Sequence, residues 1–186
     1  MTSGYTSGGL VGFSDDAAVI TTSYATGAVS NSRDAGGLVG LNRGAISTSY
    51  ATGAVTSGGG GLVEENDGTI ANSYATGAAE GGGGLIGVNG GFGVTSSYST
   101  GYAAGGGGLV LKDYNQTISA SYWDLDTSGV SDPSQGALSP ANDPGITGLT
   151  SSQLQSGLPD GFDPAVWGQS SKINGGFPYL LANPPQ

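Results

Sequence analysis

The chain has 186 residues, 38 of them glycine, and a formal net charge of −10. It contains no histidine and no cysteine, which excludes Ser-His-Asp and Cys-His nucleophiles, thiolate redox centres, disulfides and metal sites built on imidazole or sulfur. Only 4 Lys and Arg side chains accompany 14 Asp and Glu side chains, so nucleic-acid binding, which needs clustered cations, is not expected. No apolar run approaches the roughly 20 residues of a membrane span.

The chain begins part-way through a repeat. Thr2-Ser3-Gly4-Tyr5 matches Ser99-Thr100-Gly101-Tyr102, so the first copy lacks the segment that precedes this match in the later copy. An unpaired strand edge is a template for pairing with another chain. The sequence therefore predicts an uncapped N-terminal coil through which copies of the chain associate end to end or edge to edge.

Two short boxes then alternate up to residue 122, with a period near 24 residues. The first box is Gly-Gly-Leu followed by Val or Ile, and its leucines are Leu10, Leu38, Leu62, Leu85 and Leu109. The second box begins with Ser-Tyr, and its tyrosines are Tyr24, Tyr50, Tyr74, Tyr98 and Tyr122. An aliphatic residue lies four positions before each tyrosine, namely Ile20, Ile46, Ile70, Val94 and Ile118. A fixed order of boxes at a fixed period is the signature of a repeat architecture.

This repeat predicts an all-β fold, a parallel β-solenoid (β-helix) of about five coils of ~24 residues over residues 1–122. Glycine interrupts every stretch that is long enough for a helix, whereas short β-prone boxes bounded by Gly, Asn or Asp suit one coil. Stacking places equivalent residues above one another in ladders. The leucine and isoleucine ladders are expected inside, because large aliphatic residues are most often buried. The tyrosine ladder is expected to be substantially buried, but the alternation of side chains leaves open whether it points inward.

The last third of the chain has a different character. Residues 123–186 lack the boxes, contain Asp-Pro and Ser-Pro steps, and concentrate the bulky aromatic residues. We expect them to form a loop-rich C-terminal cap over the last coil, because solenoids need a covered end. One short helix is expected near residues 150–156, with Thr150 as N-cap, Gln153 three residues later and Gly157 as the stop signal.

The boxes resemble the GLUG-motif repeats of large secreted bacterial exoproteins, including adhesins of the filamentous haemagglutinin type. Gly9-Leu10-Val11-Gly12, Gly37-Leu38-Val39-Gly40 and Gly84-Leu85-Ile86-Gly87 match the motif in full, whereas Glu64 and Leu111 replace its last glycine in two copies. The resemblance covers nearly the whole chain. It implies a secreted β-solenoid stalk or adhesive segment, and it brings no catalytic residues because the motif is structural.

One stretch after the repeats suggests a calcium loop. Asp124, Asp126 and Ser128 are followed by Gly129, with Asp132 at the ninth position, and oxygen ligands at alternating positions suit calcium. Gln135 replaces the bidentate glutamate of such loops, and no helix follows it. Asx-type turns are the alternative role for these aspartates. Calcium is the one cofactor that the sequence suggests.

Carboxylates in equivalent turns suggest a second kind of site. Asp15 and Asp16 in the first copy correspond to Glu64, Glu65 and Asp67 in the third, with Arg43 between them in the second. Two carboxylates suffice for glycoside hydrolysis, so a carbohydrate-active β-helix that binds or cleaves polysaccharide is one hypothesis. Solvated turn charge is the other interpretation.

A third hypothesis concerns a ladder of hydroxyl groups. The second box places threonines at equivalent positions, namely Thr26, Thr52, Thr76 and Thr100. A flat, regular array of hydroxyl and methyl groups is the kind of surface that an ice-binding solenoid would present. Threonines in such boxes also favour β-structure and satisfy turns, which is the alternative explanation.

The sequence as a whole favours a non-enzymatic structural or adhesive repeat module of an extracellular bacterial surface protein. A polysaccharide-cleaving or polysaccharide-binding β-helix and an ice-binding solenoid are the alternatives. The expected partner is a host or environmental surface glycan or protein, and no nucleic acid or membrane span is expected. The expected location is extracellular or on the bacterial cell surface, as part of a longer exported chain, because the chain is acidic, free of cysteine and rich in Ser, Thr and Gly.

Overall fold

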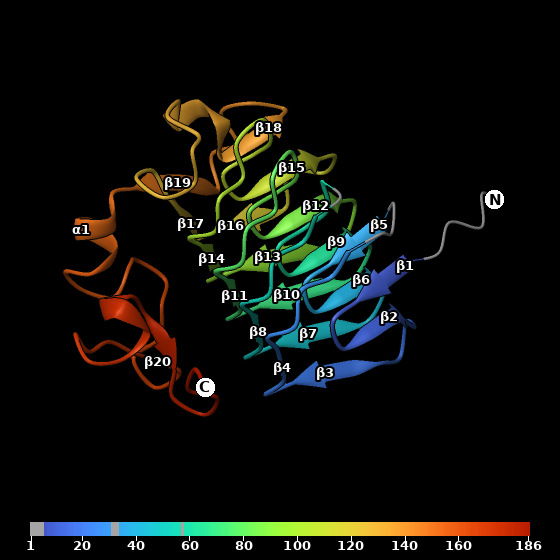
Figure 1. Ribbon diagram of the computed structural model, residues 1–186, viewed down its shortest axis with the longest axis horizontal. Coiled ribbons are helices and arrows are strands. Elements are labelled where there is room, and N and C mark those ends of the chain that lie inside the picture. Colours follow the sequence, from blue (N-terminus) through green and yellow to red (C-terminus); the bar gives the residue numbers. More distant parts are fainter. Residues whose placement is uncertain (1–5, 31–33, 57) are drawn as a thin grey trace.

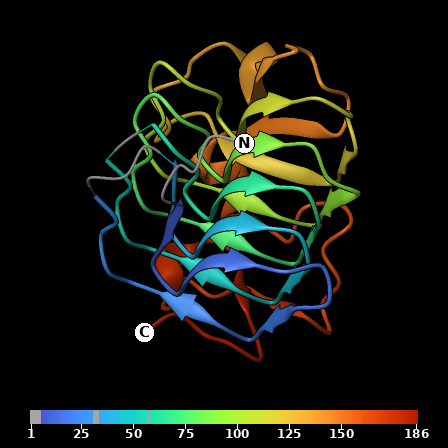
Figure 2. The ribbon, with the colours of Figure 1, turned by 90° about the vertical axis from the view of Figure 1, so that its right-hand side faces the viewer.

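The structure is a computed structural model that describes residues 6–30, 34–56 and 58–186. It is an all-β solenoid in which parallel strands from successive coils lie above one another (Figure 1). Figure 2 shows the stack from the side, with the blue N-terminal strands at the bottom and orange strands at the top. Residues 2–5, on which the expectation of a start part-way through a repeat rests, lie outside the described residues.

Each of the first five coils contributes one strand to each of three parallel sheets, and the last coil adds a strand to sheets 1 and 3 only. Sheet 1 contains β2 (Val11–Ser14), β6 (Val39–Asn42), β9 (Val63–Asn66), β12 (Ile86–Asn89), β15 (Val110–Asp113) and β18 (Ala137–Ser139). Sheet 2 contains β3 (Val19–Thr21), β7 (Ala45–Ser47), β10 (Thr69–Ala71), β13 (Gly93–Thr95) and β16 (Ile118–Ser119). Sheet 3 contains β4 (Tyr24–Ala25), β8 (Tyr50–Ala51), β11 (Tyr74–Ala75), β14 (Tyr98–Ser99), β17 (Ser121–Asp124) and β19 (Ile146–Leu149).

Further short elements lie outside these sheets. Two parallel strands, β1 (Thr6–Gly8) and β5 (Asp34–Gly36), pair with each other beside sheet 1. The antiparallel pair β20 (Trp167–Gly168) and β21 (Tyr179–Leu180) belongs to the C-terminal segment. The helical elements are the 3-10 turns η1 (Pro133–Gly136) and η2 (Asn174–Gly176) and the helix α1 (Ser151–Leu154).

The interior of the coils is a continuous aliphatic column. Four of the five ladder leucines are fully buried, whereas Leu10 in the first coil is 50% exposed. The isoleucine ladder is buried as expected from the second coil upward, and Ile20 packs against the column while remaining partly exposed. The interior position expected for both ladders is therefore confirmed wherever a coil has a neighbour on each side.

The glycines before each leucine are required by close approach of the backbone. A Cβ atom on Gly60 would lie 1.8 Å from the carbonyl oxygen of Val63. The equivalent distance is 1.8 Å at Gly36, 1.7 Å at Gly83 and 1.8 Å at Gly107. No side chain fits there, so the chain turns tightly at the same point of every coil, and these four glycines pair with one another along the stack.

A second corner of each coil uses a left-handed residue that is not glycine. Thr22, Thr48, Asn72, Ser96 and Ala120 have φ between 44° and 50°. The serine that follows this corner by one position stabilises it, as in the second coil, where Ser49 Oγ donates to the carbonyl of Ser47 at 2.8 Å. The backbone N–H of Ser23 in the coil below donates to the same hydroxyl at 3.2 Å.

The solenoid extends further than the sequence analysis expected. The boxes end at Tyr122, but β18 pairs with β15, and β19 pairs with β17. Residues 123–149 therefore form a further coil instead of a cap. The expected helix is confirmed as α1, with Thr150 as N-cap and a capping box to Gln153.

The remaining residues, 150–186, form a lateral segment that we call the brace. It lies along the outer face of sheet 3, in red beside β8 and β11 in Figure 1, rather than across the end of the stack. Asn183 near the C-terminus donates to the carbonyl of Ser23 at 3.1 Å and to that of Thr48 at 3.2 Å. The brace thus connects the last coil to the first two coils.

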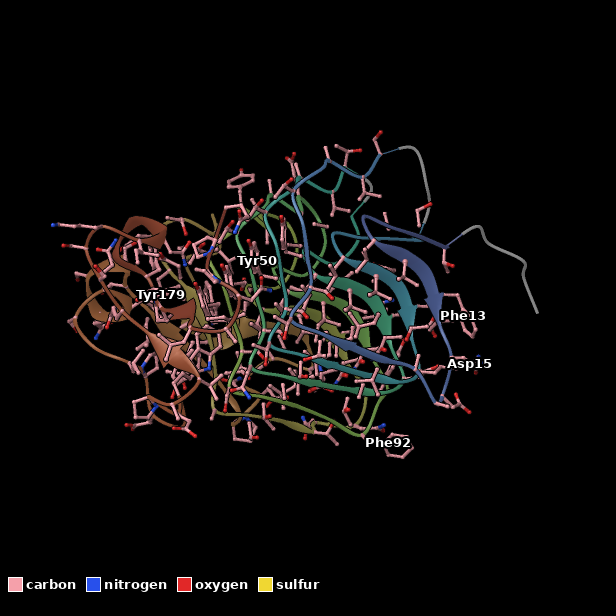
Figure 3. All side chains as sticks on the ribbon, turned by 90° about the horizontal axis from the view of Figure 1, so that it is seen from below. Phe13, Asp15, Tyr50, Phe92 and Tyr179 are labelled. Carbon is pink, nitrogen blue, oxygen red and sulfur yellow. The ribbon has the colours of Figure 1, made fainter. Side chains whose placement is uncertain are left out.

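The brace buries the tyrosine ladder from outside. Tyr50, Tyr74 and Tyr98 are fully buried and stack with centroid distances of 4.9 and 5.1 Å. They pack with the brace and not with the aliphatic column, so the ladder is buried without pointing into the lumen. Figure 3 shows Tyr50 on the side of the coils that faces the brace. Burial, with a smaller contribution from the neighbouring tyrosine, raises the pKa of the Tyr98 hydroxyl, which donates to the carbonyl of Pro178 at 2.6 Å.

Replacing a leucine inside the column tests the packing. Leu85→Ala is expected to lower the free energy of unfolding by about 2–5 kcal/mol, because it leaves a cavity between two coils. Leu10→Ala changes the same ladder position where the side chain is half exposed, and is expected to cost clearly less. Urea unfolding of both variants measures this, and equal losses would contradict the assigned interior.

Removing the largest brace side chain tests how the tyrosines are covered. Trp167 is 1% exposed and lies 6.1 Å from Tyr74 and 5.8 Å from Tyr98 between ring centroids. Trp167→Ala is expected to cost about 3–5 kcal/mol. It should also lower the pH at which the tyrosines ionise, measured by absorbance, because exposure removes the desolvation that raises their pKa. Leu181→Ala, at a position 47% exposed in the brace, is the control and should leave the tyrosine titration unchanged.

Candidate functional site

A groove lies where the turns after sheet 1 lead into sheet 2. It has a volume of about 580 Å³ and crosses four successive coils. Its lining is Asp16 to Val19, Arg43 to Ala45, Asp67 to Thr69, and Phe92. The groove therefore combines carboxylates, a guanidinium group, small side chains and an aromatic ring on one edge of the solenoid.

The coil register brings these turn residues together. The N–H of Arg43 donates to the carbonyl of Ser14 at 2.9 Å, and the N–H of Asp67 donates to that of Asn42 at 2.7 Å. The turn residues of successive coils consequently lie one above another. Residues about 24 positions apart in the sequence therefore become neighbours in space.

The charged groups of the groove are paired loosely and remain open to solvent. Arg43 Nε lies 3.7 Å from Asp67 Oδ2, with side-chain exposures of 48% and 40%. The guanidinium carbon of Arg43 also lies 5.5 Å from the centroid of the Phe13 ring. Because the pair is exposed, it contributes little to stability. Its donors and acceptors are accessible to a ligand.

The aromatic residue of the groove was not identified from the sequence. Phe92 is 85% exposed, and Figure 3 shows it projecting from the solenoid away from the brace. An apolar ring so far from the core is unusual for a side chain that serves packing alone. The available signal was an isolated phenylalanine within a glycine-rich turn, Gly90-Gly91-Phe92-Gly93.

The groove contains only part of the set of turn charges considered in the sequence analysis. Asp16, Arg43 and Asp67 line it together. Asp15 lies in the same turn as Asp16 and accepts a hydrogen bond from its N–H at 2.8 Å. Glu64 and Glu65 are part of β9, where Glu65 is paired in register with Leu41 and Val88, and neither lines the groove.

The carboxylates proposed for calcium have structural hydrogen bonds instead of a common centre. Asp124 is fully buried, and its Oδ2 accepts from Ser151 Oγ at 2.6 Å. Asp126 Oδ2 accepts from the N–H of Ser151 at 2.9 Å, so both aspartates hold the start of α1.

The other two candidate ligands are engaged elsewhere. The Asp132 carboxylate accepts from the N–H of Ser134 at the start of η1, and this hydrogen bond lowers its pKa. The Ser128 hydroxyl bonds to the backbone of Val130. The described residues contain no cluster of three or more acidic side chains arranged to hold a metal ion, so calcium at these positions stays a prediction.

The threonine ladder is not a free hydroxyl surface. Thr52, Thr76 and Thr100 are half-buried in the turns after sheet 3, and Thr26 in the first coil is exposed. A more open array lies on sheet 2, where one outward column contains Thr21, Ser47, Ala71, Thr95 and Ser119 in register. No repeated residue type marks this column in the sequence, because its members differ from coil to coil.

Comparison with protein-family models, with curated proteins and with solved structures finds no match to this chain. Among the residues that the structure describes, no helix has the length and apolarity needed to cross a membrane.

Changes in the groove are expected to leave the fold intact. Arg43→Ala and Asp67→Asn should each change the free energy of unfolding by less than about 1 kcal/mol, because exposed ion pairs contribute little. Urea unfolding of the two single variants and the double variant measures this. A loss of several kcal/mol in any of them would mean that the groove charges maintain the fold.

Proposed function

We propose that the chain is a non-enzymatic structural and adhesive repeat module. The observation that carries this proposal is the brace, which packs along the tyrosine ladder and joins the last coil to the first two. Stacked coils with continuous ladders and a lateral segment make a rod with few degrees of freedom. Such a rod suits the display, spacing or attachment of one surface to another.

The proposal includes an extracellular or bacterial cell-surface location, as part of a longer exported chain. Its support is the resemblance of the boxes to GLUG-motif repeats of the filamentous haemagglutinin type, together with the acidic, cysteine-free composition. The partner is a surface glycan or protein. The groove is the surface best suited to it, because it offers both signs of charge and an exposed ring.

Self-association through the first coil belongs to the same proposal. The strands β2, β3 and β4 are the edges of their sheets. Four large apolar side chains are exposed in this coil, namely Leu10, Phe13, Val19 and Tyr24. Open edges with apolar neighbours favour pairing with another chain.

Polysaccharide binding or cleavage by the groove carboxylates is the second candidate function. It is favoured by one observation, the presence of Asp16 and Asp67 in a single groove beside Arg43. Carboxylates and guanidinium groups hydrogen-bond sugar hydroxyls, and an exposed ring stacks on a sugar face. Hydrolysis would need the two carboxylates on opposite sides of one glycosidic bond. Ice binding keeps the outward column of sheet 2 as its support, and thermal hysteresis in dilute solution tests it.

Retention on a panel of immobilised acidic and neutral polysaccharides tests the adhesive proposal. The wild-type protein is expected to be retained without releasing reducing ends. The Arg43→Ala/Asp67→Asn variant should be retained at least about tenfold more weakly, since each charge-assisted hydrogen bond contributes about 1.5–3 kcal/mol. Lys172→Ala, an exposed change in the brace, is the matched control and should bind as the wild type does.

Two results would contradict this account. Equal retention of all variants would mean that the groove is not the adhesive surface. Release of reducing ends that is abolished by Asp16→Asn together with Asp67→Asn would show that the module is an enzyme.

A further inference from the structure

A buried polar ladder runs through the turns at the end of sheet 1. Asn42 Nδ2 donates to Asn66 Oδ1 at 2.8 Å, and Asn66 Nδ2 donates to Asn89 Oδ1 at 2.8 Å. Asn89 Nδ2 donates to Asp113 Oδ1 at 3.0 Å. All four side chains are fully buried. Each amide therefore donates in the same direction along the stack, towards the C-terminal coil.

The ladder loses its donor at Asp113. Where the second, third and fourth coils have an amide that donates onward, this carboxyl group has a second oxygen, Oδ2, that is buried with no hydrogen-bond partner among the described residues. Asp143, from the loop between β18 and β19, lies within hydrogen-bonding reach of Asp113 and is 5% exposed. Its Oδ1 accepts from the N–H of Gly145 at 2.8 Å, and its Oδ2 is likewise buried without a donor in the described chain.

Two buried carboxyl groups in contact need something positive between them. A proton placed on either one supplies the donor that an asparagine supplies in the coils below. A calcium ion takes six to eight oxygen ligands, and the described residues hold no cluster of three or more acidic side chains at this place. A protonated carboxyl group has the same shape as the asparagine amides and donates as they do. We therefore favour a shared proton over a calcium ion.

We propose that Asp113 and Asp143 form a proton-dependent latch that holds the last coil, residues 123–149, on the solenoid in acid and weakens at neutral pH. The brace begins at Thr150, directly after this coil, so the latch also determines how firmly the brace is anchored at its start. The latch consequently adds more to the stability of the rod in a mildly acidic medium than at neutral pH.

The charges around the latch agree with this direction. Burial and the hydrogen bond with Asp143 raise the pKa of Asp113 from 3.8 to about 6, and the bonds from Asn89 and from the N–H of Gln116 only partly oppose this. Lys112, the preceding residue of β15, is exposed. Because the folded pKa lies above the unfolded one, the folded state binds more protons between about pH 4 and pH 6. The contribution of this group to stability is thus fully present below about pH 4 and is lost as the pH rises through about 6.

Urea unfolding at pH 4 and pH 7.5, with EDTA in both buffers, tests the proposal in three proteins. Asp113→Asn supplies the missing donor, because the amide has the same shape as the carboxyl group. Asp16→Asn removes an exposed carboxylate and is the matched control for charge. The unfolding equilibrium constant of the wild type relative to Asp113→Asn should rise by up to roughly a hundredfold between pH 4 and pH 7.5, since the shift is about two pKa units. Asp113→Asn should be the more stable protein at pH 7.5, and Asp16→Asn should follow the wild type.

Two outcomes would overturn the proposal. Parallel pH dependence of the wild type and Asp113→Asn would mean that no proton is shared at this place. The second outcome is that calcium in place of EDTA raises the stability of the wild type at pH 7.5 to that of Asp113→Asn and leaves the variant unchanged. The pair would then be a cation site and not a latch.

Discussion

Parallel backbone pairing between coils is the constraint on which the rest of the structure depends. The N–H of each ladder leucine donates to the carbonyl of the next ladder leucine at 2.8 to 2.9 Å, from Leu10 up to Leu109. This fixes one register for the whole stack. Glycines at positions such as Gly61 follow from it, because a Cβ atom there would lie 2.1 Å from the carbonyl oxygen of Gly84 in the next coil. The buried ladders follow too, since every inward side chain meets its own equivalent.

The same constraint separates structural residues from surface residues. Side chains in the lumen and in the asparagine ladder are determined by their neighbours above and below. Turn residues such as Arg43 and Phe92 are free to vary, so the candidate groove is formed there and not within a sheet. The brace adds a second layer on sheet 3, which leaves the turns and the outer faces of sheets 1 and 2 as the surfaces available to a partner.

Much of this arrangement was predictable, because periodicity carries it. The spacing of the leucines, isoleucines and tyrosines predicts the solenoid, and the Thr150-to-Gln153 capping box predicts α1. The coil formed by residues 123–149 was missed because its strands pair with the coil below without repeating the boxes, so no repeated residues in the sequence mark its register. The placement of residues 150–186 beside the tyrosines also has no periodic signal, since it depends on contacts between residues far apart in the chain. The latch was missed for a related reason: Asp113 has a carboxyl group where the equivalent positions of the second, third and fourth coils have an amide of nearly the same shape, and Asp143 reaches it from an irregular loop.

Native-state hydrogen exchange of the wild-type protein tests the central claim, that the brace makes the tyrosine-bearing strands as much a part of the core as the leucine column. The account predicts that the amides of β8, β11 and β14 exchange as slowly as those of β6, β9 and β12, because both sets open only when the stack unfolds. Exchange of β8, β11 and β14 at the rate of exposed turns, with slow exchange kept in sheet 1, would contradict it.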